Sequence, residues 1–252
     1  MSPGDVPSAV LFDVDGTLAE TERDGHRPAF NRAFAEHGVG VHWDAAHYAR
    51  LLAVTGGRQR IAADLRRRGH RAQEAERIAA QVHRTKTALF AEHARSGSIP
   101  ARPGVRTLVA DLRRRGVRIG VVTTGRREWA EPLVGHLIGD VARGIDVAVY
   151  GDDVAALKPD PRCYRLALRR LGMPAACVVA VEDSAAGLRA ALGAGLATVV
   201  VRSEPTAGHD VRGAVLVRES FDGEPALDAE LLGALLARGQ RERRESCRRS
   251  SA

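Results

Sequence analysis

The sequence has few of the residues that mark several large classes of protein. Its three cysteines, Cys163, Cys177 and Cys247, are odd in number and widely spaced, which argues against a disulfide framework and against a zinc site. No run approaches the roughly 20 apolar residues of a membrane span, and no signal peptide precedes the first apolar run. We therefore expect a cytoplasmic protein that contacts no membrane.

Aromatic residues and lysine are also scarce. Aromatic residues make up 4% of the chain, so we expect an aliphatic core. Of the 38 lysine and arginine residues, only Lys86 and Lys158 are lysines. A lysine retained in such a chain marks a position where a compact ammonium is needed and the planar fork of arginine does not fit. Chance retention is the alternative interpretation.

The positive charge is concentrated at the C-terminus. The chain has a formal net charge of +7, and residues 238–252 contain six arginines and two glutamates. This segment has no apolar periodicity, so we expect a disordered basic tail. A protein that binds nucleic acid through this tail is the alternative from a different functional class; we expect no nucleic-acid partner.

Short apolar runs indicate buried parallel strands. They lie at residues 9–12, 118–123, 145–150, 177–182 and 197–201. The later runs alternate with amphipathic helical patterns, which is typical of a doubly wound α/β sheet. About a hundred residues with helical patterns separate the first two runs, far more than a crossover needs. We therefore expect an α/β core over residues 1–20 and 99–237, with an inserted helical domain over 21–98.

Polar side chains follow these runs at the points where the strands end. Because ligands bind beyond the carboxyl ends of parallel strands, we expect these side chains to lie close together. They are Asp13, Asp15, Thr123, Thr124, Lys158, Glu182 and Asp183.

Carboxylates crowded into one cleft need a cation, and oxygen ligands favour Mg²⁺. The arrangement predicts Asp13 as a nucleophile toward phosphate, Asp15 as a general acid and base, and Lys158 as the charge between two anions. The hydroxyl of Thr123 and neighbouring groups around Thr124 would hold the phosphoryl oxygens.

The stretches "FDVDGT", "VVTTG", "LKPDP" and "VEDSAAG" occur in this order, and they resemble the four motifs of the haloacid-dehalogenase superfamily. The resemblance implies a Rossmann-like core with a helical cap of the phosphoglucomutase-like branch, and the activity of a phosphoric monoester hydrolase. It also implies that Asp13, Asp15 and Asp183 hold Mg²⁺, with Glu182 as an additional candidate ligand. Thr123 and Lys158 would bind phosphate.

Within that branch, "DVDGTLAETERDGHRPAFNRAF" and "TGGRQRIAADL" are similar to CbbY-type proteins. The resemblance implies a phosphatase acting on a small phosphorylated sugar, most of all on xylulose 1,5-bisphosphate. A β-phosphoglucomutase-like phosphomutase and a phosphoglycolate-type phosphatase are the alternatives. We expect a monomer.

Five residues of the inserted domain are candidates for substrate binding. Glu22 and His26 follow the first strand-end motif closely. Arg58 and Arg60 stand at a helix start after two glycines, where anions bind readily. Lys86 is the only lysine of the insert. Ordinary solvated surface residues are the alternative interpretation for each.

Overall fold

The chain divides into two compact units. The computed structural model describes residues 6–52, 54 and 56–250. One unit, the sheet unit, comprises Met1–Ala19 and Pro100–Ala252, and the other, the helical unit, comprises Glu20–Ile99. The sequence placed the inserted domain at residues 21–98, one residue shorter at each end.

The sheet unit is built on six parallel strands. Their order across the sheet is β3-β2-β1-β4-β5-β6. The bounds are Ala9–Phe12 for β1, Arg118–Val122 for β2, Val147–Val149 for β3, Val178–Glu182 for β4, Ala197–Val201 for β5 and Leu216–Arg218 for β6. The sequence predicted the first five and missed β6. β6 overlaps a short apolar run at residues 214–217, which was not counted among the expected strands; it is a half-exposed edge strand of three residues.

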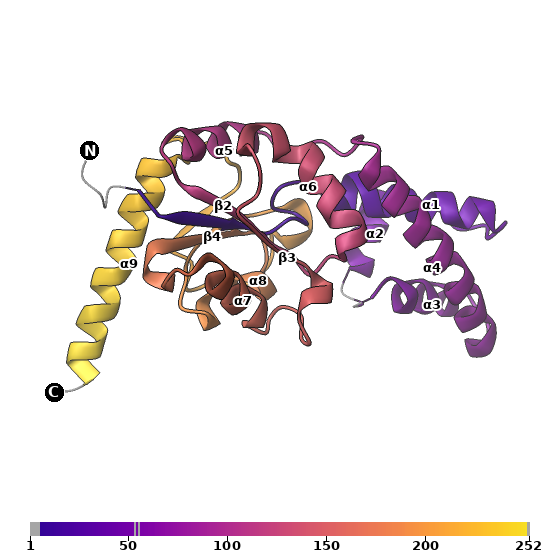
Figure 1. The fold of residues 1–252 in the computed structure, drawn as a ribbon. Coiled ribbons are helices and arrows are strands. Elements are labelled where there is room, and N and C mark those ends of the chain that lie inside the picture. Colours follow the sequence, from indigo (N-terminus) through magenta and orange to yellow (C-terminus); the bar gives the residue numbers. More distant parts are fainter. Residues whose placement is uncertain (1–5, 53, 55, 251–252) are drawn as a thin grey trace. The chain divides into compact units, whose positions relative to one another are not determined.

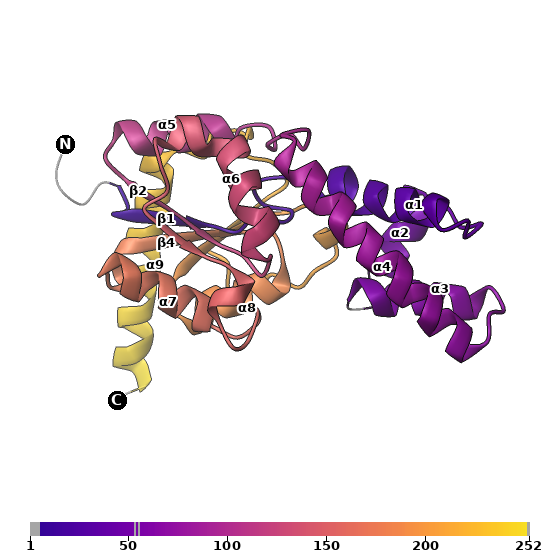
Figure 2. The same cartoon turned by 45° about the vertical axis from the view of Figure 1, so that its right-hand side comes forward.

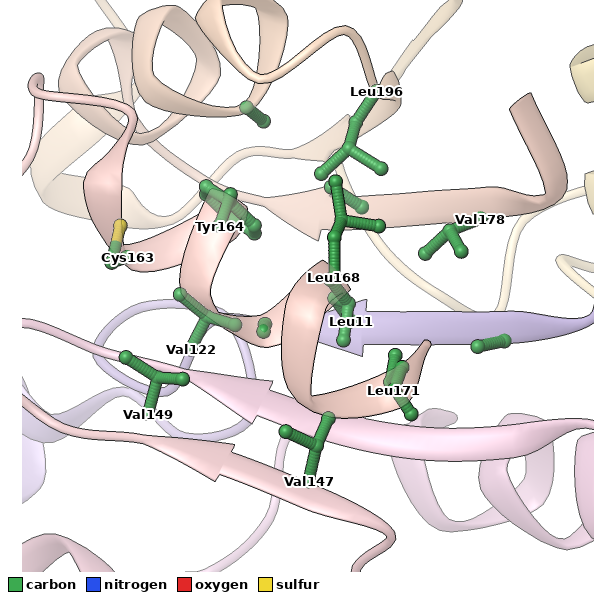
Figure 3. Close-up of a cluster of buried hydrophobic side chains, with 14 of the residues drawn as sticks. Leu11, Val122, Val147, Val149, Cys163, Tyr164, Leu168, Leu171, Val178 and Leu196 are labelled. Atoms are coloured by element: carbon green, nitrogen blue, oxygen red, sulfur yellow. The ribbon is translucent and has the colours of Figure 1, made fainter. Parts of the chain in front are cut away.

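Helices cover both faces of the sheet (Figures 1 and 2). α5 (Val105–Arg114) and α6 (Arg127–Ala142) lie on one face, and α7 (Arg162–Leu171) and α8 (Ala185–Gly193) lie on the other. Figure 3 shows how α7 packs its apolar side, including Tyr164 and Leu168, over the strands near Leu11 and Val122. This core is mainly aliphatic, as the composition predicted.

α9 (Ala229–Ser250) begins where the Ala229 N–H donates to Asp111 Oδ2 of α5 at 3.0 Å. The sequence predicted disorder over residues 238–252, but the backbone through Ser250 is helical. The run after Gly239 contains neither glycine nor proline and is rich in arginine, glutamate and glutamine, which are good helix formers. Residues 251–252 lie outside the described part of the chain.

The helical unit opens with a π-helical turn, Glu22–His26, followed by α1 (Arg27–Glu36), α2 (Ala45–Leu51), α3 (Gly57–Arg67) and α4 (Ala72–Arg95). No strand occurs among the described residues of this unit. Its core is not purely aliphatic, because the scarce aromatic residues gather in it. The rings of Phe30, Phe34, Trp43 and Tyr48 contact one another with centroids 4.8 to 6.5 Å apart.

Within the described ranges, none of the helices combines the length and apolarity that crossing a membrane requires.

Candidate active site

The register of the sheet aligns three residues at the carboxyl ends of its central strands. Phe12 pairs with Val121 on one side and with Val181 on the other. The next residues along these three strands, Asp13, Val122 and Glu182, therefore lie in one row across the sheet. The Asp13 N–H donates to Val181 O at 3.0 Å, which keeps the row in register beyond the end of β1.

Lys158 joins this row from the loop before α7. Its ammonium donates to Asp13 Oδ1 at 2.6 Å, to Glu182 Oε1 at 2.7 Å and to Val122 O at 2.8 Å. The side chain is 5% exposed. Burial alone would lower the pKa of Lys158, but the two carboxylates outweigh burial and raise it. The ammonium therefore stays charged and lies beside the predicted nucleophile.

Glu182 is completely buried and has different partners at its two oxygens. Oε1 accepts from Lys158 and, at 2.5 Å, from the hydroxyl of Tyr164. Oε2 has no hydrogen-bond partner among the described residues. Burial, followed by the charge of Asp13, raises the pKa of Glu182 to about 7 although Lys158 opposes the shift.

Asp183 completes a cluster of three buried carboxylates. Oxygens of Asp13, Glu182 and Asp183 all lie within 4.8 Å of one another. Burial, and then the charges of Asp13 and Glu182, raise the pKa of Asp183 well above its ordinary value. Lys158 is the one ammonium bonded to this cluster in the described residues, so negative charge remains in excess. The all-oxygen donors, the excess charge and the unpartnered Glu182 Oε2 fit a hard divalent cation such as Mg²⁺.

The loop after Asp13 is held in a shape that requires glycine. Gly16 has φ +83°, and a Cβ there would lie 2.1 Å from Asp183 Oδ2. Arg102, buried at the return to the sheet unit, donates to Gly16 O and, at 3.1 Å, to Val201 O. Asp15 is half-buried in this loop and forms an isolated bridge with Ala19. The predicted acid and base is thus carried by a loop tied to the end of β5.

The two threonines after β2 differ in exposure. Thr123 is buried, and its Oγ1 accepts from the Gly125 N–H at 2.9 Å. Thr124 is exposed. Because the Thr123 N–H donates to Val149 O at 3.0 Å, its backbone continues the sheet pairing, and Thr123 lies one residue beyond Val122 of the aligned row.

In the helical unit, two predicted residues share a buried tyrosine. The Tyr48 hydroxyl donates to Glu22 Oε2 at 2.5 Å and accepts from Arg60 Nη1 at 3.1 Å. Arg60 Nε also donates to Leu51 O at 3.1 Å, and the residue is 8% exposed. Arg60 therefore does not behave as an ordinary surface arginine.

Two more predicted residues of the helical unit bind each other. Lys86 Nζ lies 2.8 Å from His26 Nδ1, and Lys86 is 7% exposed. The ammonium also lies 4.8 Å from the ring centroid of Phe30 and 4.9 Å from that of Phe90. Burial first, and then the positive charge of Lys86, lower the pKa of His26 well below its usual value, so the imidazole accepts the hydrogen bond in its neutral form.

Arg58 lies apart from these contacts. It is exposed and pairs with Glu76 at 3.5 Å. Arg58 is therefore an exposed residue and Arg60 a buried one, although the two are only two positions apart in the sequence.

Sequence reasoning missed three residues that contact the predicted ones. Tyr164 donates to Glu182, Ser203 donates to Asp183 Oδ2 at 2.7 Å, and Tyr48 joins Glu22 to Arg60. Ser203 follows β5 by two positions, so the strand-end rule applied to one more strand would have found it. The tyrosines lie in amphipathic helical patterns, where they read as ordinary core residues.

The family model for haloacid dehalogenase-like hydrolases matches residues 7–195. This chain belongs to the haloacid dehalogenase-like hydrolases. The CbbY protein of Cereibacter sphaeroides is 46% identical over 214 residues, which cover 84% of this chain and 92% of that protein. As a haloacid dehalogenase-like hydrolase of CbbY type, the chain is a phosphoric monoester hydrolase.

Two solved structures extend the comparison of this haloacid dehalogenase-like hydrolase. A mutant of CbbY from Rhodobacter sphaeroides in complex with xylulose 1,5-bisphosphate is 44% identical, with a TM-score of 0.72, covering 88% of this chain and 97% of that chain. A putative β-phosphoglucomutase from Thermotoga maritima is 26% identical, with a TM-score of 0.66, covering 92% of this chain and 99% of that chain.

Proposed function

We propose that the protein is a Mg²⁺-dependent phosphatase that hydrolyses a sugar bisphosphate, with xylulose 1,5-bisphosphate as its preferred substrate. The observation that carries this proposal is the Lys158 ammonium 2.6 Å from Asp13 in a cluster of three buried carboxylates. The complex of the similar CbbY protein with that bisphosphate supports the choice of sugar.

In this proposal Asp13 attacks the phosphorus atom and the bond from phosphorus to the sugar oxygen breaks. An aspartyl-phosphate forms, and Asp15 gives its proton to the leaving oxygen. Asp15 then takes a proton from the water that attacks the aspartyl-phosphate, which releases phosphate and restores Asp13. Lys158 and the hydroxyl of Thr123 orient the phosphoryl oxygens, with Thr124 beside them.

The carboxylates of Asp13 and Asp183 and the carbonyl of Asp15 would hold Mg²⁺. Glu182 would contribute Oε2, since its other oxygen already binds Lys158 and Tyr164. When bound, the ion neutralises charge that develops on the transferring phosphoryl group.

The substrate's second phosphate needs a partner besides Asp13 and Lys158. Arg60 and Lys86 are buried cations of the helical unit, and Glu22, His26 and Tyr48 hold them in place. Buried donors of this kind bind dianions strongly because little water competes with them. We assign the second phosphate to these cations, with Arg58 as a further candidate, and the sugar hydroxyls to Glu22 and His26.

The test is phosphate release from a panel of sugar monophosphates and bisphosphates, each measured with Mg²⁺ and with a chelator. We expect the highest kcat/KM for xylulose 1,5-bisphosphate and no release after chelation. Conversion of β-glucose 1-phosphate to glucose 6-phosphate without net phosphate release would instead establish the phosphomutase alternative. A higher kcat/KM for phosphoglycolate than for any sugar bisphosphate would establish the alternative of a phosphoglycolate-type phosphatase.

A further inference from the structure

Asp183 is held on one side by contacts that belong neither to the carboxylate cluster nor to Lys158. The hydroxyl of Ser203 donates to Asp183 Oδ2 at 2.7 Å, and Ser203 is 3% exposed. Gly16 lies against the same oxygen, because a Cβ at Gly16 would be 2.1 Å from Oδ2 and 3.0 Å from Ser203 Oγ. Asp183 Oδ2 therefore lies between the hydroxyl of Ser203 and the backbone of Gly16.

Thr206 holds Ser203 on the side away from Asp183. The Ser203 N–H donates to Thr206 Oγ1 at 3.1 Å, and the oxygens of the two hydroxyls are 2.9 Å apart. A hydroxyl has one proton to donate, and an ionised Asp183 only accepts. The Ser203 proton therefore goes to Asp183, and the Thr206 hydroxyl has Ser203 Oγ at 2.9 Å and Ser203 O at 3.3 Å as acceptors. Both residues belong to the short 3₁₀ turn Glu204–Thr206 and its cap, directly after β5.

This contact matters because the neighbours of Asp183 repel it. Carboxylate oxygens of Asp13 and Glu182 lie within 4.8 Å of an oxygen of Asp183, and the Ser203 donor offsets this repulsion and fixes the orientation of the carboxylate. Hydrogen bonds from outside a metal site orient the ligands, and their loss typically weakens metal binding about 10- to 100-fold.

We propose that Ser203 is a positioning residue that orients Asp183 toward a divalent cation, with Thr206 holding Ser203 in place. The proposal rests on the Mg²⁺ site of the proposed function. It adds two residues after β5 to that site, neither of which touches the substrate or the reacting atoms.

The experiment compares Mg²⁺ binding by isothermal titration calorimetry, without substrate, in the wild-type protein, Ser203→Ala and Thr206→Val. Thr198→Val is the matched control. Thr198 is a fully buried threonine of the neighbouring strand β5, and its hydroxyl donates only to Leu196 O at 3.4 Å among the contacts described. Thermal unfolding and kcat at saturating Mg²⁺ are measured on the same samples.

We expect Ser203→Ala to raise the Kd for Mg²⁺ at least tenfold, and Thr206→Val to raise it by a smaller factor. The control should change it by less than twofold. Excess Mg²⁺ should restore most of the turnover of Ser203→Ala, because the residue acts on metal binding. A merely structural role would lower the unfolding temperature and leave the Kd unchanged.

A Kd for folded Ser203→Ala within twofold of the wild-type value would overturn the proposal while leaving the Mg²⁺ site itself intact. If Ser203→Ala does not fold, an unchanged Kd in Thr206→Val overturns it in the same way. Absence of Mg²⁺ binding in the wild-type protein would overturn the metal assignment of the proposed function together with this inference.

Discussion

The ammonium of Lys158 lies 2.6 Å from the carboxylate of Asp13, although 145 positions separate the two residues in the chain. The same nitrogen also donates to Glu182 and to Val122 O and lies 5.3 Å from the ring centroid of Tyr164. A compact ammonium can donate to these closely placed acceptors and still present its positive charge to a phosphoryl group beside Asp13.

We therefore expect Lys158→Arg to lose at least tenfold in kcat, which corresponds to about 1.4 kcal/mol of barrier. The substitution keeps the charge but replaces a point donor with a planar fork that does not fit among the three acceptors. The measurement is steady-state phosphate release with saturating Mg²⁺. Arg162→Lys, the reverse exchange at a nearby exposed position, is the control and should retain full activity. Near wild-type turnover in Lys158→Arg would mean that charge alone matters at this position.

Asp13→Asn should abolish turnover and leave the protein folded. The amide removes the nucleophilic oxygen and the negative charge, while Lys158 keeps Glu182 and Val122 O as partners. The backbone bond from residue 13 to Val181 O is also unaffected. Phosphate release and thermal unfolding measured together check both parts of the prediction. A folded variant that releases phosphate at the normal rate would contradict the assignment of Asp13 as nucleophile.

Strand ends were the most predictable part of this protein. Asp13, Thr123 and Glu182 each follow a continuous apolar run, and parallel strands necessarily bring their carboxyl ends together. Which of these side chains contact one another was not predictable, because the contacts depend on strand register and on the direction of each side chain. Only the register places Glu182 beside Asp13, and only the fold of α7 brings the Tyr164 hydroxyl to Glu182.

The helical unit was predictable as helices but not in its core. Its aromatic cluster uses residues that are rare in the chain, so composition pointed to an aliphatic interior instead. The five candidate residues of this unit were chosen for charge and position alone. The structure separates them into Glu22 with Arg60, His26 with Lys86, and an exposed Arg58, a division that depends on the three-dimensional packing of α2, α3 and α4.

His26 should make the stability of the protein depend on pH. Its pKa is held well below the usual 6.5 in the folded state, first by burial and then by Lys86. Below pH 6.5 the unfolded chain therefore binds a proton that the folded chain does not, and the free energy of unfolding falls as the pH falls. Between pH 8 and pH 5, His26 lowers the free energy of unfolding by up to about 2 kcal/mol at 25 °C.

Denaturant unfolding of the wild-type protein and of His26→Gln at pH 8 and pH 5 measures this cost. The variant should lose less stability on acidification than the wild type, by up to that amount. His42→Gln, which removes an exposed imidazole of the same unit, should keep the wild-type dependence. Equal losses in His26→Gln and the wild type would show that His26 is protonated in the folded protein at pH 5.

Arg60 and Lys86 should hold the second phosphate of a bisphosphate. Arg60 and Lys86 are buried cations, whereas Arg58 shares Glu76 with the equally exposed Arg66 on the same helix. A charge-assisted hydrogen bond contributes about 1.5–3 kcal/mol, which is roughly 10- to 100-fold in kcat/KM. Binding energy from the remote phosphate can also assist the chemical step, so both KM and kcat should respond.

Each of the three cations is therefore replaced by methionine in turn, with Arg66→Met as the matched control. The quantity to compare is the ratio of kcat/KM for the bisphosphate to kcat/KM for the corresponding monophosphate. We expect this ratio to fall at least tenfold in Arg60→Met or Lys86→Met and to stay unchanged in the control. A general loss of folding would lower both kcat/KM values together and leave the ratio constant. An unchanged ratio in all three variants would place the second phosphate elsewhere and remove the support that these residues give to a bisphosphate substrate.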